Sequence, residues 1–387
     1  MGFVSLLGSS VISAIGFIVI ASNRWLAVEA QVAVFLILFV QWQTLGLTIA
    51  KTGIEQVVFA MVSKDDAAYL NPLGYVFSKA LPLALLFSIV VCFVFSPWAG
   101  TVAFGTILLD TWSLIIMADL NARQRFGVTA ASNLLNYPLF FAGIFIISRF
   151  ERLTIPIVLM VFLLASVVRW AFLANNRFVR EGMREVVCTA SMEMGVQQVL
   201  NHLLFRADQI VLAILGLKLQ SVNDAGMYIF LAKFPELAAG VMVVAGTVLF
   251  PRMYISYPCD IRQLLGSLVK RWPLAAGYVA ALALALALYL VLWKGTDISP
   301  WLLLPFLLHT LAIILVNNIT YSALRQGYLR RLLINLAVAV SVGLAVAVQL
   351  HFDFNVFVLA WIVPVQLLVF ISLTFALNWG RTRQLYG

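Results

Sequence analysis

One segment of the chain concentrates side chains that could bind a charged or hydroxyl-rich ligand. Residues 191–216 are largely apolar, yet they carry eight polar or ionisable groups: Glu193, Gln197, Gln198, Asn201, His202, Arg206, Asp208 and Gln209. At about 100° per residue, these groups fall on two neighbouring stripes of a helix. The remaining face is apolar and suits lipid; it consists of Val196, Val199, Leu203, Ala207 and Ile210. A purely structural helix rarely needs so broad a polar face.

The apolar segment 225–250 adds two more charges, Lys233 and Glu236. At about 1.5 Å of rise per residue, Lys233 lies roughly 12 Å below the outward-facing surface of the membrane, and Arg206 and Asp208 lie about 12–15 Å below it. Because the depths are similar, we hypothesise two ion pairs: Asp208 with Lys233, and Arg206 with Glu236. Two interpretations remain open: neutral pairs that lock two helices together, or a polar, partly cationic cavity that opens to the outer side.

Other ionisable residues lie in or beside apolar segments. Asp110 is in the middle of residues 101–119, where a carboxylate could couple transport to a proton or sodium ion, although one isolated acid is a weak signal. Arg169 lies near the cytoplasmic end of residues 155–174, and Arg24 follows the first apolar segment. Arg24 could add positive charge to the cavity or extend to the lipid headgroups. An ionisable group inside a span costs about 2.5–3.5 kcal/mol on insertion scales, so it usually faces the bundle interior.

The elements that position these groups are predicted to be membrane helices. Of 387 residues, 63% are apolar and 11% are charged, whereas soluble domains carry roughly 25% charged residues. A span needs about 20 apolar residues. The chain offers twelve such segments: 3–22, 32–50, 75–95, 101–119, 128–148, 155–174, 191–216, 225–250, 272–293, 300–320, 332–350 and 355–377. We therefore expect an all-α integral membrane protein with about 12 transmembrane helices.

The twelve segments divide into two predicted lobes of six helices around a central cavity. Residues 1–174 form the N-lobe, residues 175–190 a cytoplasmic connection, and residues 191–387 the C-lobe. Such a division is typical of transporters with repeated halves. Most of the 25 Lys and Arg residues lie on the side that holds both termini; the opposite side holds Arg24, Arg149, Arg152, Lys218 and Lys294. The positive-inside rule therefore predicts that both termini are cytoplasmic, in a multi-pass protein of the cell inner membrane.

Several classes of function are disfavoured. The sequence contains no Walker A, G-x-S-x-G or H-E-x-x-H motif and no acidic metal cluster, so we expect no enzyme, cofactor or metal site. Cys92, Cys188 and Cys259 are far apart and lack metal-ligand spacing. The net charge of +9 comes mainly from short loops, so nucleic acid is not an expected partner.

The segment from Phe205 to Gly216, with the sequence FRADQIVLAILG, resembles the seventh helix of polysaccharide transporters, the Wzx-type flippases. The elements that follow are similar to that family in order and spacing: Gly226-Met227-Tyr228, Lys233-Phe234-Pro235-Glu236 and Phe250-Pro251-Arg252. Near the start, Arg24-Trp25-Leu26, Glu29 and Gly53-Ile54-Glu55-Gln56 look like its first two helices.

The resemblance implies membership of the multidrug/oligosaccharidyl-lipid/polysaccharide exporter superfamily. The implied activity is flipping of undecaprenyl-pyrophosphate-linked oligosaccharide from the cytoplasmic to the periplasmic leaflet for O-antigen, capsule or exopolysaccharide synthesis, beside a polysaccharide polymerase and chain-length machinery. The implied substrate-binding set contains Arg206 and Lys233, with Arg24 beside them; Asp208, Glu236, His202 and Asn201 complete the candidate site. Two alternatives remain: a cation-coupled multidrug or metabolite antiporter of the same superfamily, and a membrane polysaccharide polymerase or ligase.

Overall fold

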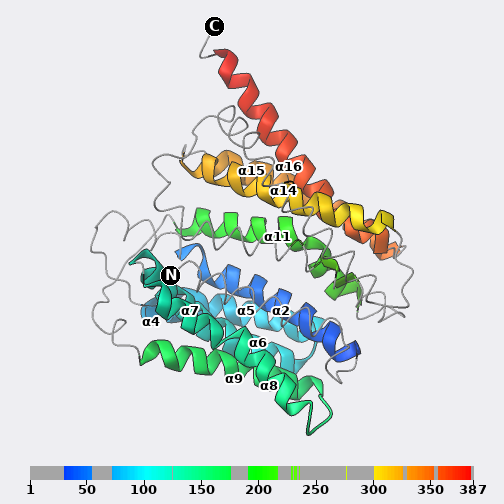
Figure 1. Cartoon of the computed structure of the whole chain (residues 1–387). Coiled ribbons are helices and arrows are strands. Elements are labelled where there is room, and N and C mark those ends of the chain that lie inside the picture. The colour runs from blue at the N-terminus through cyan, green and yellow to red at the C-terminus, as the bar shows by residue number, and fades with distance from the viewer. Residues whose placement is uncertain are drawn as a thin grey trace. The chain divides into compact units, whose positions relative to one another are not determined.

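The structure is a computed structural model (Figure 1). It describes seven main segments, at residues 30–54, 72–123, 125–175, 191–216, 300–325, 329–352 and 356–384, together with residues 228, 229, 231, 232, 235 and 276. The predicted spans 3–22, 225–250 and 272–293 lie wholly or mostly outside the described residues.

The described part of the chain is helical and contains no strand. Seven of its helical segments are long and apolar enough to cross a membrane: Gln31–Lys51, Val76–Val94, Pro97–Asn121, Phe126–Ile147, Ile155–Ala174, Arg331–Gln349 and Val358–Ala376. The predicted all-α integral membrane fold is confirmed.

Contacts along the backbone divide the chain into two compact units. The first comprises residues 1–202, 209–229 and 244–251, and the second comprises residues 203–208, 230–243 and 252–387. Most of the predicted inter-lobe connection, 175–190, lies outside the described residues, so the proposed lobe boundaries stay a prediction.

In the first unit, helix α6 (Pro97–Ala122) is surrounded by its neighbours. It packs against α2 (Ala30–Lys51), the α5 helix (Leu81–Val94) and α9 (Ile155–Ala174). The N-terminus of α6 is capped because the Ser96 hydroxyl accepts a hydrogen bond from the Ala99 N–H, at 3.2 Å. This central position explains why polar residues of α6 are buried.

Proline interrupts two of the predicted spans. The span expected at 75–95 begins with α4 (Pro72–Tyr75) and a π-helical segment, Val76–Ala80, before α5, which has Pro82 in its first turn. The span expected at 128–148 forms two helices, α7 (Phe126–Leu134) and α8 (Tyr137–Ile147), with Pro138 at the start of α8. Proline has no N–H to donate, and its ring clashes with the carbonyl four residues earlier, which here belongs to Leu134.

One face of α5 is apolar and exposed, as expected of a surface covered by lipid. Leu86 is 64% exposed and Phe93 is 87% exposed, and Leu85, Ile89 and Val90 lie on the same side. The buried side of the helix carries smaller groups, such as Ala84, Ser88 and Val91. The contrast fits a helix that packs on α6 along one side and contacts acyl chains along the other.

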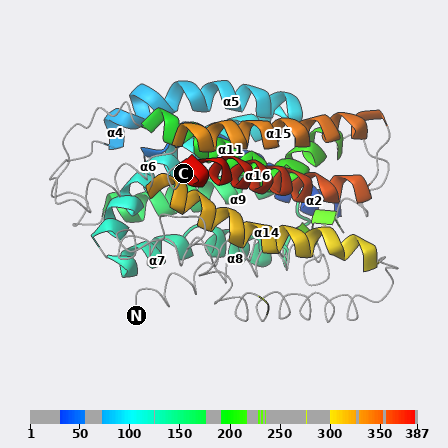
Figure 2. The same cartoon turned by 90° about the horizontal axis from the view of Figure 1, so that it is seen from above.

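In the second unit, α16 (Val356–Gln384) packs against both α14 (Pro300–Arg325) and α15 (Leu329–Phe352), as Figure 2 shows. Buried polar groups join α15 to α16: the Asn335 amide donates to the Thr374 hydroxyl at 3.2 Å, and the Gln366 amide donates to the Val340 carbonyl at 3.4 Å. Interhelical hydrogen bonds of this kind stabilise membrane helix pairs.

Candidate functional site

The polar segment singled out in the sequence forms one helix, α11, from Ser191 to Gly216. Its bounds coincide with the predicted span 191–216. Although it has 26 residues, α11 is not among the seven apolar spans, because its polar face lowers its hydropathy. Gln197, Asp208 and Gln209 are each at most 2% exposed. The helix therefore buries polar groups along much of its length.

A kink divides α11 at Arg206, whose backbone angles (φ −140°, ψ 16°) are not helical. Side chains that follow a kink no longer keep the regular angular spacing to those before it, so one face of the helix need not continue across the kink. Val196 is 46% exposed, as a lipid-facing residue should be, but Ala207 and Ile210 are buried, at 2% and 8% exposure. The prediction of one continuous lipid-facing stripe is therefore wrong for the residues that follow the kink.

Three amide oxygens on the first half of α11 are buried and accept no hydrogen bond from the part of the chain that the structure describes. They are Oε1 of Gln197, Oε1 of Gln198 and Oδ1 of Asn201. Most buried side-chain polar atoms in proteins have a partner, so such a cluster needs an explanation. Amide oxygens are acceptors, and the matching ligand groups are hydroxyl and N–H donors.

The structure places the predicted site residues of α11 on both sides of its kink. Asn201 and His202 precede the kink, Arg206 is the kink residue, and Asp208 follows it within the next turn. The remaining predicted substrate-binding residues, Arg24, Lys233 and Glu236, lie outside the described residues. The pairs Asp208 with Lys233 and Arg206 with Glu236 remain hypotheses.

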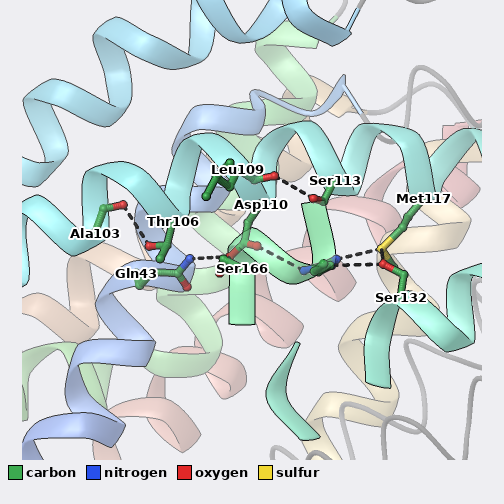
Figure 3. A network of polar contacts seen from close by, with 10 residues as sticks. Gln43, Ala103, Thr106, Leu109, Asp110, Ser113, Met117, Ser132 and Ser166 are labelled. Carbon is green, nitrogen blue, oxygen red and sulfur yellow. Dashed lines mark hydrogen bonds and ion pairs between the residues drawn. The ribbon is translucent and has the colours of Figure 1, made fainter. Parts of the chain in front are cut away.

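A second buried polar site lies within the first unit, around Asp110 of α6 (Figure 3). The Asp110 carboxylate forms an ion pair with Arg169 of α9, with 3.5 Å between Oδ1 and Nη1. Its other oxygen accepts hydrogen bonds from the Gln43 amide of α2 at 3.1 Å and from the Ser166 hydroxyl of α9 at 3.4 Å. The side chains of Asp110 and Arg169 are 3% and 5% exposed.

The rest of the Arg169 guanidinium is also in contact with polar atoms. Nη2 lies 2.8 Å from the sulfur of Met117, and Nε donates to the Ser132 hydroxyl at 3.4 Å. Ser132 in turn donates to the Met117 sulfur at 3.5 Å. The network therefore joins four helices, α2, α6, α7 and α9.

Sequence reasoning located Asp110 and Arg169 but did not pair them, and the interpretation of Asp110 as an isolated acid is wrong. The position of Arg169 in the sequence predicts that its Cα lies near the cytoplasmic end of its helix. Cα–Cβ bonds in an α-helix point towards the N-terminus, so the long side chain extends back along α9 towards the level of Asp110. The available signal is an acid and a base that both lie inside apolar segments, at 101–119 and 155–174.

The Asp110 network is a neutral ion pair with further hydrogen bonds, whereas three buried amide oxygens of α11 lack a donor among the described residues. Among the described residues, no group of three His, Cys, Asp or Glu side chains is arranged to hold a metal ion. The two sites therefore differ: α11 has buried acceptor oxygens without a partner among the described residues, and the Asp110 network satisfies its own charges.

Three solved structures are similar to the chain over 99% of its length and 95% of theirs. One is a MATE protein in complex with MaD3S, with 13% sequence identity and a TM-score of 0.59. Another is an outward-facing multidrug resistance MATE family transporter of the MOP superfamily, with 14% identity and a TM-score of 0.60.

The third is a MOP superfamily transporter from Pyrococcus furiosus, described as having a binding pocket of reverse polarity that suggests a different function. It has 12% identity and a TM-score of 0.52. No family model matches the sequence, and no curated protein matches it. The chain thus has the fold of MOP superfamily transporters.

Proposed function

We propose that this protein is a flippase that moves undecaprenyl-pyrophosphate-linked oligosaccharide units from the cytoplasmic to the periplasmic leaflet by alternating access. The moved units would serve the synthesis of O-antigen, capsule or exopolysaccharide. The observation that carries the proposal is the polar face of α11, with the buried acceptor oxygens of Gln197, Gln198 and Asn201 before the kink at Arg206. A transport role, not an enzymatic one, agrees with the fold shared with MOP superfamily transporters.

The chemistry of α11 matches the two polar parts of such a cargo. Sugar hydroxyls donate hydrogen bonds, and the amide oxygens of α11 accept them. A pyrophosphate needs positive charge when it leaves water, and charge-assisted contacts are stronger in a medium of low dielectric constant. Arg206, with Lys233 and Arg24, would supply that charge. The lipid tail would stay in the bilayer throughout.

The proposed topology places both termini in the cytoplasm and the protein in the inner membrane. The cargo would then enter from the leaflet where lipid-linked units are assembled and leave where a polymerase and chain-length machinery act. The candidate site residues are Arg206, Lys233, Asp208, Glu236, Arg24, His202 and Asn201.

The proposal is tested by replacing the cations in a strain whose surface polysaccharide depends on this protein. Arg206→Ala and Lys233→Ala should trap unpolymerised lipid-linked units on the cytoplasmic leaflet while the protein is still inserted. Arg123→Ala is the matched control, because the Arg123 side chain is 53% exposed and its ion pair among the described residues is with Asp119, four residues earlier. Normal surface glycan in both cavity variants would contradict the proposal.

A second candidate function is a multidrug or metabolite antiporter, because one of the similar structures is a multidrug resistance transporter. Such a protein would expel a cationic dye from vesicles in response to an imposed proton or sodium gradient. Dye efflux together with normal lipid-linked glycan in the cavity variants would favour this function over flipping. A polysaccharide polymerase or ligase is disfavoured by the short, carboxylate-poor outward segments of the sequence.

A further inference from the structure

Asp110 is the residue for which the sequence suggests coupling to a proton or sodium ion, yet the positive charge of Arg169 already lies beside it. Asp110 is 2% exposed and Arg169 is 4% exposed. The distance between Oδ1 of Asp110 and Nη1 of Arg169 is 3.5 Å, and Oδ2 accepts from Gln43 and Ser166. A buried carboxylate is tolerated when it is paired and hydrogen-bonded, and both conditions are met by residues of the chain itself.

A sodium ion at this carboxylate would be close to the guanidinium. Two like charges a few ångströms apart repel strongly in an environment of low dielectric constant. The ion could therefore bind only if the guanidinium moved away. A sodium ion would also have to displace the amide and hydroxyl donors that now face Oδ2.

The contacts of Arg169 hold the guanidinium in place. Nη2 contacts the Met117 sulfur at 2.8 Å, and Nε donates to Ser132 at 3.4 Å. These partners belong to α6 and α7, so the guanidinium is fixed by elements other than its own helix. A planar group held on several sides is poorly suited to swing out of the way during a transport cycle.

We propose that the Arg169 guanidinium supplies the positive charge beside Asp110 in the first unit. It takes the place that a sodium ion would take, so the Asp110 site binds no sodium. The inference goes beyond the proposed function and holds for any cargo. It also makes a positive prediction, because removal of the guanidinium leaves oxygen ligands behind. These are the Asp110 carboxylate, the Ser166 hydroxyl and Oε1 of Gln43, which accepts no hydrogen bond from the described residues. Hard oxygen ligands of this kind suit hard cations.

The test is the thermal unfolding midpoint of the purified full chain in detergent, measured in sodium chloride and in choline chloride of equal concentration. For Arg169→Gln, sodium should raise the midpoint by at least about 2 °C over choline, as binding to the folded state requires. Arg169→Lys retains the positive charge and should show no such gain. A folded Arg169→Gln protein without a sodium effect would overturn the proposal.

A second comparison decides the matter if Arg169→Gln fails to fold. The double variant Asp110→Asn with Arg169→Gln replaces both charges by neutral groups of similar size and leaves neither charge unpaired. If sodium raises the unfolding midpoint of the wild type, it should raise that of the double variant by the same amount. According to the proposal, such a sodium ion binds away from Asp110, where the two substitutions have no effect. A sodium effect that is present in the wild type and lost in the double variant would overturn the assignment. Neither measurement involves a lipid-linked cargo, so failure of the flippase proposal would leave both results interpretable.

Discussion

Gly343 of α15 lies directly against the side-chain amide of Gln366 of α16, so that even one added methyl group would overlap the amide. Gln366 is fully buried, and its amide donates to the Val340 carbonyl one turn before Gly343. The absence of a side chain at position 343 therefore makes room for a polar contact between two membrane helices. Close approach through small residues is a general feature of helix packing in membranes.

Gly343→Ala should destabilise the protein by about 1–3 kcal/mol, the usual cost of overpacking a core. A thermal unfolding midpoint in detergent measures the effect. Gly127→Ala is the control, because a methyl group there has nothing within 4 Å. Since alanine is favoured over glycine inside a helix, the control should be neutral or more stable by up to about 1 kcal/mol. Equal midpoints for the two variants would contradict the close contact.

The Asp110–Arg169 pair should behave as a strongly coupled unit in a double-mutant cycle. Asp110→Asn alone and Arg169→Met alone each leave one buried charge without its partner, which costs about 3–5 kcal/mol. The double variant leaves no charge, so it should be more stable than the sum of the single effects predicts, and unfolding midpoints of the four proteins measure the difference. Additive effects would show that the two side chains do not interact.

Gln197 should matter for transport more than for stability. Its Oε1 accepts no hydrogen bond from the described residues, so Gln197→Leu removes this buried acceptor without breaking a hydrogen bond to it within the described part. Stability should stay within about 1 kcal/mol of the wild type. Transport should fall about tenfold if one cargo hydrogen bond of roughly 1.4 kcal/mol is lost.

The control for Gln197→Leu is Val196→Leu on the exposed side of the same helix. Lipid-linked glycan that reaches the periplasmic leaflet is the readout, with the amount of inserted protein measured alongside it. A large loss of stability with unchanged transport per inserted molecule would assign Gln197 a structural role.

The proposed orientation can be checked with reporter fusions. Lys and Arg are concentrated on the side predicted to hold both termini, so a green fluorescent protein fused after residue 387 should fluoresce in the cytoplasm. Alkaline phosphatase fused after Arg152, in the segment between α8 and α9, should be active because that segment is predicted to face outward. If alkaline phosphatase fused at the C-terminus were active, the predicted orientation would be wrong.

The sequence alone was sufficient to predict the helices whose limits depend on local composition. Residues 155–174 and 191–216 form α9 and α11 with the expected bounds. The length of an apolar run is a property of consecutive residues, and a membrane helix satisfies its backbone hydrogen bonds within that run. The break between α7 and α8 could not be predicted from Pro138 alone, because proline is tolerated in many membrane helices.

Which polar residues meet was decided by the tertiary structure. Helical periodicity predicts that Gln197, Asn201 and Arg206 share a polar face, but it predicts neither the kink at Arg206 nor the burial of Ala207 and Ile210. Asp110 and Arg169 are 59 residues apart, and Gln43 is 67 residues from Asp110. Periodicity fixes the relative directions of side chains on one helix. It carries no information on the rotation of that helix against its neighbours, and that rotation brings the buried acid to its base.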